Sequence, residues 1–251
     1  PLRIVIADDE APSRNRLRDL LADAAAEIAT VVVGEAANGR ALIDLLADCP
    51  ADVVLLDIRM PGMDGIEAAR HLQSLPDAPR IVFTTAYDTY AVQAFELHAL
   101  DYLMKPIRGR RLVDALMRVR AAPPIPADVL RELAPAPRTH LAVPERGRVT
   151  LVPVTDILFL RAELKYVSIR TAERELLLEE SLARLETEFA ARFVRIHRSY
   201  LVARDRITGF ERVPGDGQDQ HWVALLAGCD EKLPVSRRQA HIVREFGRPD
   251  D

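Results

Sequence analysis

Residues 53–65, with the sequence V-V-L-L-D-I-R-M-P-G-M-D-G, constrain the fold more than any other stretch of the chain. Four apolar residues end in the carboxylate of Asp57, and Pro61-Gly62 then interrupts regular structure. Such a run is typical of a parallel strand buried on both faces, and it would deliver Asp57 to the carboxyl end of that strand. Open α/β sheets place their chemistry at this edge, so Asp57 is the first candidate functional residue.

The first half of the chain alternates between short apolar runs and amphipathic helical patterns. Strands are predicted at residues 3–7, 30–34, 53–57, 80–84 and 101–104, and helices at residues 12–25, 40–47, 65–75, 90–97 and 109–121. Five strand–helix units with short connections predict an α/β domain, built as a doubly wound five-stranded parallel sheet with helices on both faces.

Residues 122–138 contain five prolines, which break regular structure and favour an extended, semi-stiff linker. A short helix at residues 129–133 is compatible with this linker. We therefore expect one domain at residues 1–121 and a second at residues 139–251.

The second domain shows a different periodicity. Strand-like segments are predicted at residues 140–143, 149–153, 157–161, 166–171, 175–178, 193–196, 207–213, 222–226 and 232–235, with one helix at residues 181–189. Strands and helices do not alternate here, so we predict a mainly antiparallel β domain.

Charge and composition narrow the function classes. The net charge of −4 argues against a general nucleic-acid binder. Residues 139–251 carry 18 Lys and Arg and 18 Asp and Glu, so any binding of a polyanion by this domain must come from local clusters of basic residues. Cys49 and Cys229 fit neither a disulfide framework nor a zinc site. No apolar run approaches eighteen residues, and we expect a soluble cytoplasmic protein.

Three carboxylates converge if the strands follow the doubly wound order. Asp8 and Asp9 follow the first strand, and Asp57 ends the third. Carboxylates this close repel one another unless a hard divalent cation such as Mg²⁺ or Mn²⁺ lies among them. Lys105 follows the fifth strand and Thr85 the fourth, adding a cation and a hydroxyl. Together these groups can form and hold an acyl phosphate.

Each of these residues also has an ordinary structural explanation. Asp8 and Asp9 can cap the first helix, Lys105 can be a solvated loop residue, and Thr85 can be a turn hydroxyl. Four such residues at successive strand ends are much less expected by chance, which favours the functional interpretation.

The same residues carry a resemblance to the receiver domain of bacterial two-component response regulators. The matching motifs are D-D-E at 8–10, L-L-D-I-R-M-P-G-M-D-G at 55–65, T-T-A at 84–86 and K-P at 105–106. The resemblance implies that a histidine kinase phosphorylates Asp57 and that Lys105 pairs with the phosphate. It further implies a Mg²⁺ site and a cis-proline junction. It also implies a switch pair, a threonine and a tyrosine whose hydroxyl and ring reorient on phosphorylation, in which Thr84 is an alternative to Thr85. The implied residues are Asp8, Asp9, Asp57 and the backbone carbonyl of Arg59 for Mg²⁺, Thr85 and Tyr102 for the switch, and Lys105-Pro106 for the junction.

Basic residues of the second domain gather in or beside predicted turns, at residues 161–166, 195–200 and 236–239. Arg and Lys on loops of a rigid β scaffold can contact phosphates, and Arg can read guanine edges. On charge alone, a solvated face with local ion pairs is the favoured explanation of these residues.

The order of segments resembles the LytTR-type DNA-binding domain, and the whole chain is similar to the alginate-regulator class of response regulators. The matching segments are L-K-Y-V-S-I-R at 164–170, E-E-S-L-A-R-L-E at 179–186, F-V-R-I-H-R-S-Y-L-V at 193–202 and L-P-V-S-R-R at 233–238. The resemblance implies a β-rich fold whose loops enter successive DNA grooves at direct-repeat promoter sites. The resemblance implies DNA contacts for Lys165, Arg198, Ser199, and Arg237 or Arg238. His197 is expected to be a structural hydrogen-bonding residue, and Ser199-Tyr200 stands where the family often has Asn.

The combined expectation is a transcription regulator in which phosphorylation of Asp57 shifts a two-state receiver and changes the pairing or placement of the β domain on promoter DNA. Residues 90–103 are the expected homodimer surface. Two other classes stay open. A phosphoaspartyl enzyme would need a second carboxylate at position 59, which is Arg59, and a signalling adaptor would bind protein through its β domain.

Overall fold

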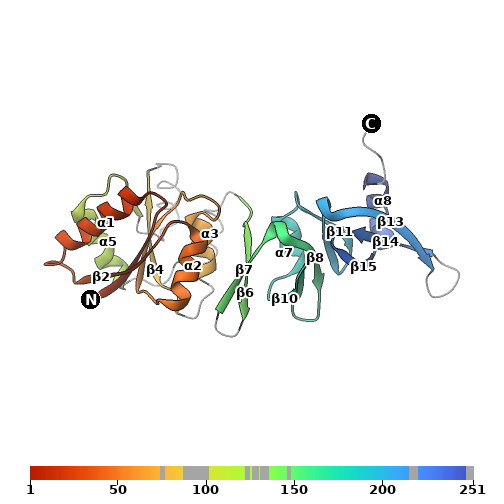
Figure 1. Cartoon of the computed structure of the whole chain (residues 1–251), viewed down its shortest axis with the longest axis horizontal. Coiled ribbons are helices and arrows are strands. Elements are labelled where there is room, and N and C mark those ends of the chain that lie inside the picture. Colours follow the sequence, from red (N-terminus) through yellow and green to blue (C-terminus); the bar gives the residue numbers. More distant parts are fainter. Residues whose placement is uncertain are drawn as a thin grey trace. The chain divides into compact units, whose positions relative to one another are not determined.

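The computed structural model describes residues 1–73, 77–86, 102–121, 125, 130, 136–145, 148–214 and 220–246. The chain divides into two compact units, Pro1–Thr139 and His140–Asp251 (Figure 1). The helix expected at residues 90–97, most of the expected dimer surface and most of the linker helix lie outside the described residues.

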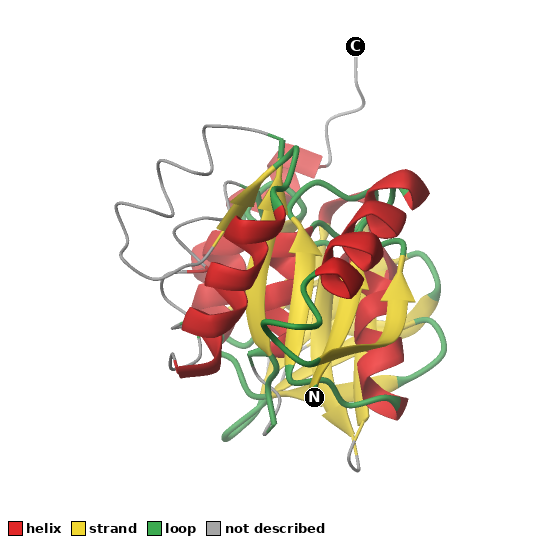
Figure 2. Ribbon diagram, turned by 90° about the vertical axis from the view of Figure 1, so that its left-hand side faces the viewer, coloured by secondary structure: helices red, strands yellow, loops and turns green. Residues whose placement is uncertain are grey.

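The first unit contains a five-stranded parallel sheet with the strand order β2-β1-β3-β4-β5. Its strands are β1 (Leu2–Ala7), β2 (Thr30–Ala36), β3 (Val53–Asp57), β4 (Arg80–Thr85) and β5 (Tyr102–Met104). Its described helices are α1 (Ala11–Asp23), α2 (Gly39–Asp48), α3 (Gly65–Leu72) and α5 (Gly109–Ala121). Figure 2 shows helices on both faces of the sheet, so the doubly wound prediction is confirmed.

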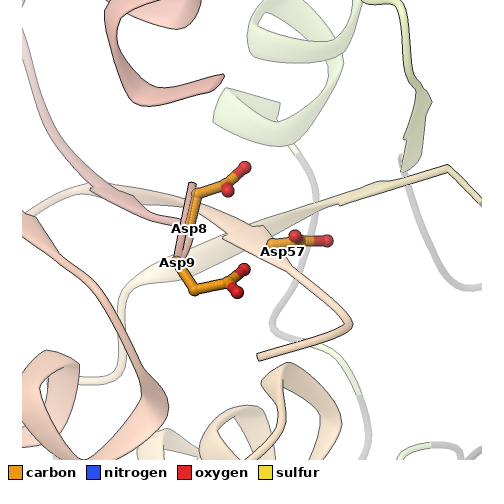
Figure 3. A group of neighbouring side chains, drawn as sticks. All are labelled: Asp8, Asp9 and Asp57. Carbon is orange, nitrogen blue, oxygen red and sulfur yellow. The ribbon is translucent and has the colours of Figure 1, made fainter. Parts of the chain in front are cut away.

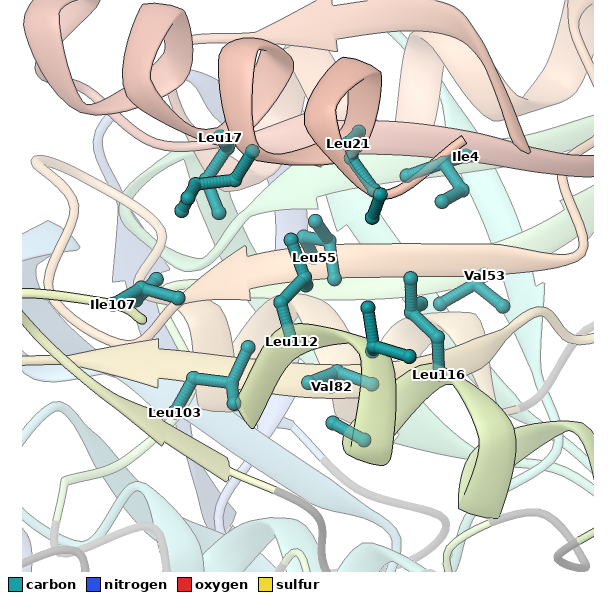
Figure 4. Close-up of a cluster of buried hydrophobic side chains, with 14 of the residues drawn as sticks. Ile4, Leu17, Leu21, Val53, Leu55, Val82, Leu103, Ile107, Leu112 and Leu116 are labelled. Carbon is teal, nitrogen blue, oxygen red and sulfur yellow. The ribbon is translucent and has the colours of Figure 1, made fainter. Parts of the chain in front are cut away.

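The core between the sheet and helices α1 and α5 follows from the alternation of side chains along the strands. Leu55 of β3 points to this face, where Leu17 and Leu21 of α1 and Leu112 and Leu116 of α5 cover it (Figure 4). Each of these leucines is at most 3 % exposed. Full burial of one such side chain contributes about 1.5–3 kcal/mol, so this layer holds the sheet rigid beneath its carboxyl edge.

The loop after β3 brings the next helix directly against the strand end. Asp64 caps α3 by accepting a hydrogen bond from the Glu67 backbone N–H at 2.8 Å. At Gly65 a Cβ atom would lie 2.0 Å from the carbonyl oxygen of Asp57, so only glycine fits there. Gly62 has a φ of 77°, which glycine adopts without strain. The P-G-M-D-G sequence therefore fixes the short connection beside Asp57.

The second unit is mainly antiparallel β, as predicted, with sheets ordered β10-β9-β8-β12-β11, β13-β14-β15 and β6-β7. Its strands are β6 (His140–Glu145), β7 (Arg148–Pro153), β8 (Ile157–Ala162), β9 (Val167–Thr171), β10 (Glu175–Leu178), β11 (Phe193–His197), β12 (Tyr200–Ala203), β13 (Ile207–Pro214), β14 (Gln220–Leu226) and β15 (Cys229–Pro234). Its helices are α7 (Leu182–Glu188) and α8 (His241–Phe246), with three short 3-10 helices at Val154–Asp156, Arg204–Arg206 and Arg237–Gln239.

Three features of this unit differ from the predictions. Strand β12 was not predicted, because its turn from β11 contains no Gly, Pro or Asn. Helix α8 was also not predicted, since six residues carry too little periodicity. Residues 161–166 were expected to connect two strands, with Arg161 also the last residue of the predicted strand 157–161. Strand β8 instead continues through Ala162, and the loop to β9 is residues 163–166. Across the part of the chain that the structure describes, no helix is long and apolar enough to cross a membrane.

Candidate functional sites

Asp8, Asp9 and Asp57 meet at the carboxyl edge of the parallel sheet. Strand β1 pairs directly with β3, with Ala7 opposite Leu56, so the residues that follow β1 lie beside the end of β3. One carboxylate oxygen from each of the three aspartates lies within 4.8 Å of the others (Figure 3). Asp8 and Asp57 are buried, and Asp9 is exposed. The strand order thus produces the juxtaposition that the sequence suggested.

Lys105 bridges the two buried carboxylates. Its Nζ lies 2.8 Å from Asp8 Oδ2 and 2.9 Å from Asp57 Oδ2. Lys105 follows β5, where its backbone N–H donates to the carbonyl of Thr85 at 2.8 Å and its peptide bond to Pro106 is cis. The Lys105-Pro106 geometry confirms the expected cis junction.

Burial and charge act in opposite directions on this pocket. Burial raises the pKa of Asp57, the Lys105 ammonium opposes that rise, and the charge of Asp8 adds to it. Burial works to lower the pKa of Lys105, but its hydrogen bonds to Asp8 and Asp57 and their charges outweigh this effect and raise the pKa. Lys105 therefore stays protonated at neutral pH, and the carboxylates are held together by its positive charge.

The donor set fits a hard divalent cation. Three carboxylates and one ammonium leave the pocket with an excess of two negative charges, and all of its free ligand atoms are oxygen. Mg²⁺ prefers such ligands and keeps part of its water shell, which the exposed Asp9 side permits. The Arg59 backbone N–H lies 3.4 Å from Asp57 Oδ1, so Arg59 belongs to the same loop around the phosphoacceptor candidate.

The two threonines at the end of β4 occupy different positions relative to Asp57. Thr84 is the register partner of Asp57, whereas Thr85 pairs with Met104. Both threonines are fully buried, and within the described residues the Thr84 hydroxyl has no hydrogen-bond partner. Tyr102 is half-buried at the start of β5. Both hydroxyls therefore stay candidates for the switch, with Tyr102 on the neighbouring strand.

In the second unit, three loops with candidate basic residues are joined to strand β11 or its turn. Residues 163–166 connect β8 to β9 and contain Lys165. Ala162, the last residue of β8 before this loop, donates its N–H to the Ser199 carbonyl at 2.8 Å. Arg198 and Ser199 form the turn from β11 to β12. The Ser236 N–H, directly before Arg237, donates to the Ile196 carbonyl at 2.9 Å.

These backbone hydrogen bonds bring the sequence-predicted residues onto one edge of the unit. The side chains of Lys165, Arg198, Arg237 and Arg238 are all exposed there. A cluster of exposed cations on rigidly tied loops is suited to contact a polyanion.

His197 and Ser199 form a local hydrogen-bonded pair. Nδ1 of His197 lies 2.7 Å from the Ser199 hydroxyl and 3.3 Å from the Ser199 backbone nitrogen, so Nδ1 accepts both hydrogen bonds and the ring proton is on Nε2. Burial lowers the pKa of His197, and the charges of Arg198 and Arg195 lower it further. His197 is thus a neutral residue that shapes the turn.

Arg161 cannot serve as one of the loop cations that the turn pattern suggested. Its guanidinium contacts Glu175 at 2.6 Å, Glu163 at 3.3 Å and Glu231 at 3.4 Å. Glu175 and Glu231 come from strands β10 and β15, so only the sheet pairing reveals this cluster.

Comparison with known proteins identifies both domains of the chain. Residues 4–117 match the response regulator receiver domain, and residues 147–247 match the LytTr DNA-binding domain. The chain is 38 % identical to the positive alginate biosynthesis regulatory protein of Pseudomonas aeruginosa over 98 % of each chain. It is 30 % identical to the sensory transduction protein LytT of Bacillus subtilis, again over 98 % of each. The chain belongs to the family of two-component response regulators that combine a receiver domain with a LytTR DNA-binding domain and regulate transcription.

Proposed function

We propose that a sensor histidine kinase phosphorylates Asp57, and that this change controls how Lys165, Arg198, Ser199 and the Arg237-Arg238 pair engage promoter DNA. The DNA contacts are proposed because backbone hydrogen bonds connect the loops that contain these residues to β11 and its turn. A surface built in this way presents several cations in one fixed arrangement. Such an arrangement suits recognition of a regular phosphate backbone and the base edges between its strands.

The phosphoryl transfer uses the pocket at the end of β3. The Asp57 carboxylate attacks the phosphorus of the kinase phosphohistidine, so an O–P bond forms as the N–P bond breaks. Lys105, already 2.9 Å from Asp57 Oδ2, pairs with the phosphoryl oxygens. Thr85 or Thr84 supplies a hydroxyl, and Tyr102 is the aromatic partner of the switch.

Asp8, Asp9, Asp57 and the backbone carbonyl of Arg59 would hold Mg²⁺, which neutralises negative charge on the phosphoryl group. The support is the charge excess and the oxygen donors of the pocket. Asp57 is regenerated by hydrolysis of its own phosphate, so the protein is proposed to be a signalling switch without turnover of external substrates. Arg59 stands where a phosphoaspartyl enzyme would need a second carboxylate.

The linker is proposed at residues 122–138, between a receiver at 1–121 and a DNA-binding domain at 139–251. The activated protein is proposed to bind direct repeats as a homodimer in the cytoplasm, where promoter DNA lies.

The test is a titration of the full-length protein, with and without phosphorylation, against direct-repeat promoter DNA over a range of salt concentrations. Arg198→Ala is expected to weaken binding by about 1–3 kcal/mol, or roughly fivefold to more than a hundredfold. Arg174→Ala removes an arginine that is also exposed, from the β9–β10 turn, and is the matched control, with an expected change in DNA affinity below about twofold.

Equal losses in the two variants would mean that only bulk charge matters and would refute the assigned contacts. Absence of salt-sensitive DNA binding by the wild-type protein would favour the adaptor class with a protein partner.

A further inference from the structure

Arg195 of β11 directs its side chain back onto its own turn. Its Nε donates to the His197 carbonyl at 2.8 Å, and its Nη2 donates to the Arg198 carbonyl. Its Nη1 donates to Glu186 Oε2 of helix α7 at 2.7 Å. All three nitrogens of the guanidinium are thus occupied, and only 21 % of the side chain is exposed.

The backbone explains why this turn needs added donors. The pairing of β11 with β12 shifts register between Arg195 and His197, so the regular ladder is interrupted next to the turn. Carbonyls released by such an irregularity need other partners. The planar fork of an arginine supplies two N–H groups to successive carbonyls, which the single ammonium of a lysine cannot do in the same geometry.

Glu186 accounts for the orientation of Arg195. An arginine with an unoccupied edge on a surface that faces DNA would be drawn to a phosphate. A carboxylate at the same place repels the DNA phosphates, so its presence is favourable for DNA binding only if it stabilises another part of the interface. The 2.7 Å charge-assisted hydrogen bond from Arg195 Nη1 to Glu186 provides this stabilisation, because it fixes the guanidinium against α7.

We propose that Arg195 and Glu186 are positioning residues for the DNA interface: they hold the Arg198-Ser199 turn in the form in which Arg198 reaches DNA, and neither contacts DNA itself. This proposal rests on the proposed function of Arg198. It assigns to an acidic residue a favourable effect on the binding of a polyanion, which simple charge repulsion does not predict.

Two substitutions of Glu186 separate its charge from its position. Glu186→Gln and Glu186→Ala remove the same negative charge, but the glutamine retains a carbonyl oxygen that accepts from Arg195. Full-length protein is titrated against the same promoter DNA at fixed salt. Glu186→Ala is expected to weaken binding about threefold to tenfold, the range for loss of one hydrogen bond, and Glu186→Gln to stay within about twofold of wild type.

Glu179→Ala is the matched control, because Glu179 is an exposed carboxylate of the same unit. It is expected to leave binding unchanged or slightly tighter. Tighter binding by both Glu186 variants, as in the control, would overturn the proposal because charge alone would then explain the data.

A double-mutant cycle tests whether Glu186 acts through Arg198. In an Arg198→Ala background, Glu186→Ala is expected to cause no further loss beyond about twofold. Losses that multiply would overturn the proposal, since Glu186 would then affect DNA binding by another route.

Hydrogen exchange of the peptide that contains residues 195–203 gives a readout independent of DNA. Glu186→Ala, but not Glu186→Gln, is expected to speed exchange of the Ser199 amide, which donates to His197. Unchanged exchange in Glu186→Ala would overturn the positioning role. Normal DNA binding by Arg198→Ala, with faster exchange in Glu186→Ala, would instead refute only the assigned DNA contact.

Discussion

Lys105→Met is expected to destabilise the first unit strongly when no divalent cation is present. The Lys105 ammonium lies 2.8 Å and 2.9 Å from carboxylates whose side chains are 0 % and 7 % exposed, while its own side chain is 18 % exposed. One such charge pair at about 4 Å is worth about 4 kcal/mol at an effective dielectric constant of 20, before the desolvation cost of the charges. Removal of one partner from a buried pair costs about 3–5 kcal/mol, and we expect about 3 kcal/mol here.

Addition of Mg²⁺ is expected to restore much of this loss. The variant pocket holds three negative charges without a cation, so Mg²⁺ binds its folded state more tightly and stabilises it by mass action. The increase in the free energy of unfolding with Mg²⁺ is therefore larger for Lys105→Met than for the wild type.

Urea unfolding with two probes measures these differences unit by unit. Circular dichroism follows both units, whereas Trp222, the single tryptophan, follows the second. Lys232→Met is the matched control, because Lys232 forms a 2.8 Å pair with Glu211 at an exposed site and its loss should cost less than about 1 kcal/mol.

Two results would refute the reasoning about this pocket. One is a Lys105→Met protein as stable as wild type without Mg²⁺. The other is equal stabilisation of both proteins by Mg²⁺, which would place the cation outside the reach of Lys105.

Three further predictions concern the scaffold and the turn. Gly65→Ala forces a shift against the Asp57 carbonyl, so it should lower the free energy of unfolding in urea by more than about 2 kcal/mol and slow phosphorylation by acetyl phosphate. Gly209→Ala is the control, because there is open space around Gly209, and it should have neither effect. Leu112→Ala, at a fully buried site, should cost about 3–4 kcal/mol, and a loss below about 1 kcal/mol would contradict the packing described for α5. The pKa of His197 is lowered in the folded protein, so the unfolded chain binds the proton more readily and the free energy of unfolding falls as the pH drops below about 6.5. An NMR titration of His197 with a midpoint at or above this ordinary value would contradict the burial of the ring.

The features that the sequence predicted are those that local patterns determine. The parallel sheet follows from alternating apolar and amphipathic segments, because short connections leave few topologies. The carboxylate pocket follows in turn from the strand order, since Asp8 and Asp57 end neighbouring strands. Lys105 was found in the same way, as the residue after the last strand.

The features that sequence reasoning missed depend on contacts between distant segments. The hairpin that starts β12 turns at Arg198-Ser199 without Gly, Pro, Asn or Asp, because the side chains of His197 and Arg195 supply the hydrogen bonds. The partners of Arg161 come from strands that only the folded sheets bring together. Glu186 carried no signal of its own, since a glutamate on a short amphipathic helix is ordinarily a solvated surface residue.

The backbone ties from Ala162 to Ser199 and from Ser236 to Ile196 have a consequence for how such a regulator acquires new targets. Because both loops are supported by β11 and its turn, an insertion in one of them would change the orientation of the other. Divergence toward a new promoter is therefore expected to proceed by exchange of side chains at the proposed DNA contacts, Lys165, Arg198 and Arg237-Arg238, while loop lengths stay constant. A library that varies only these positions would then sample most of the accessible specificities on an unchanged backbone.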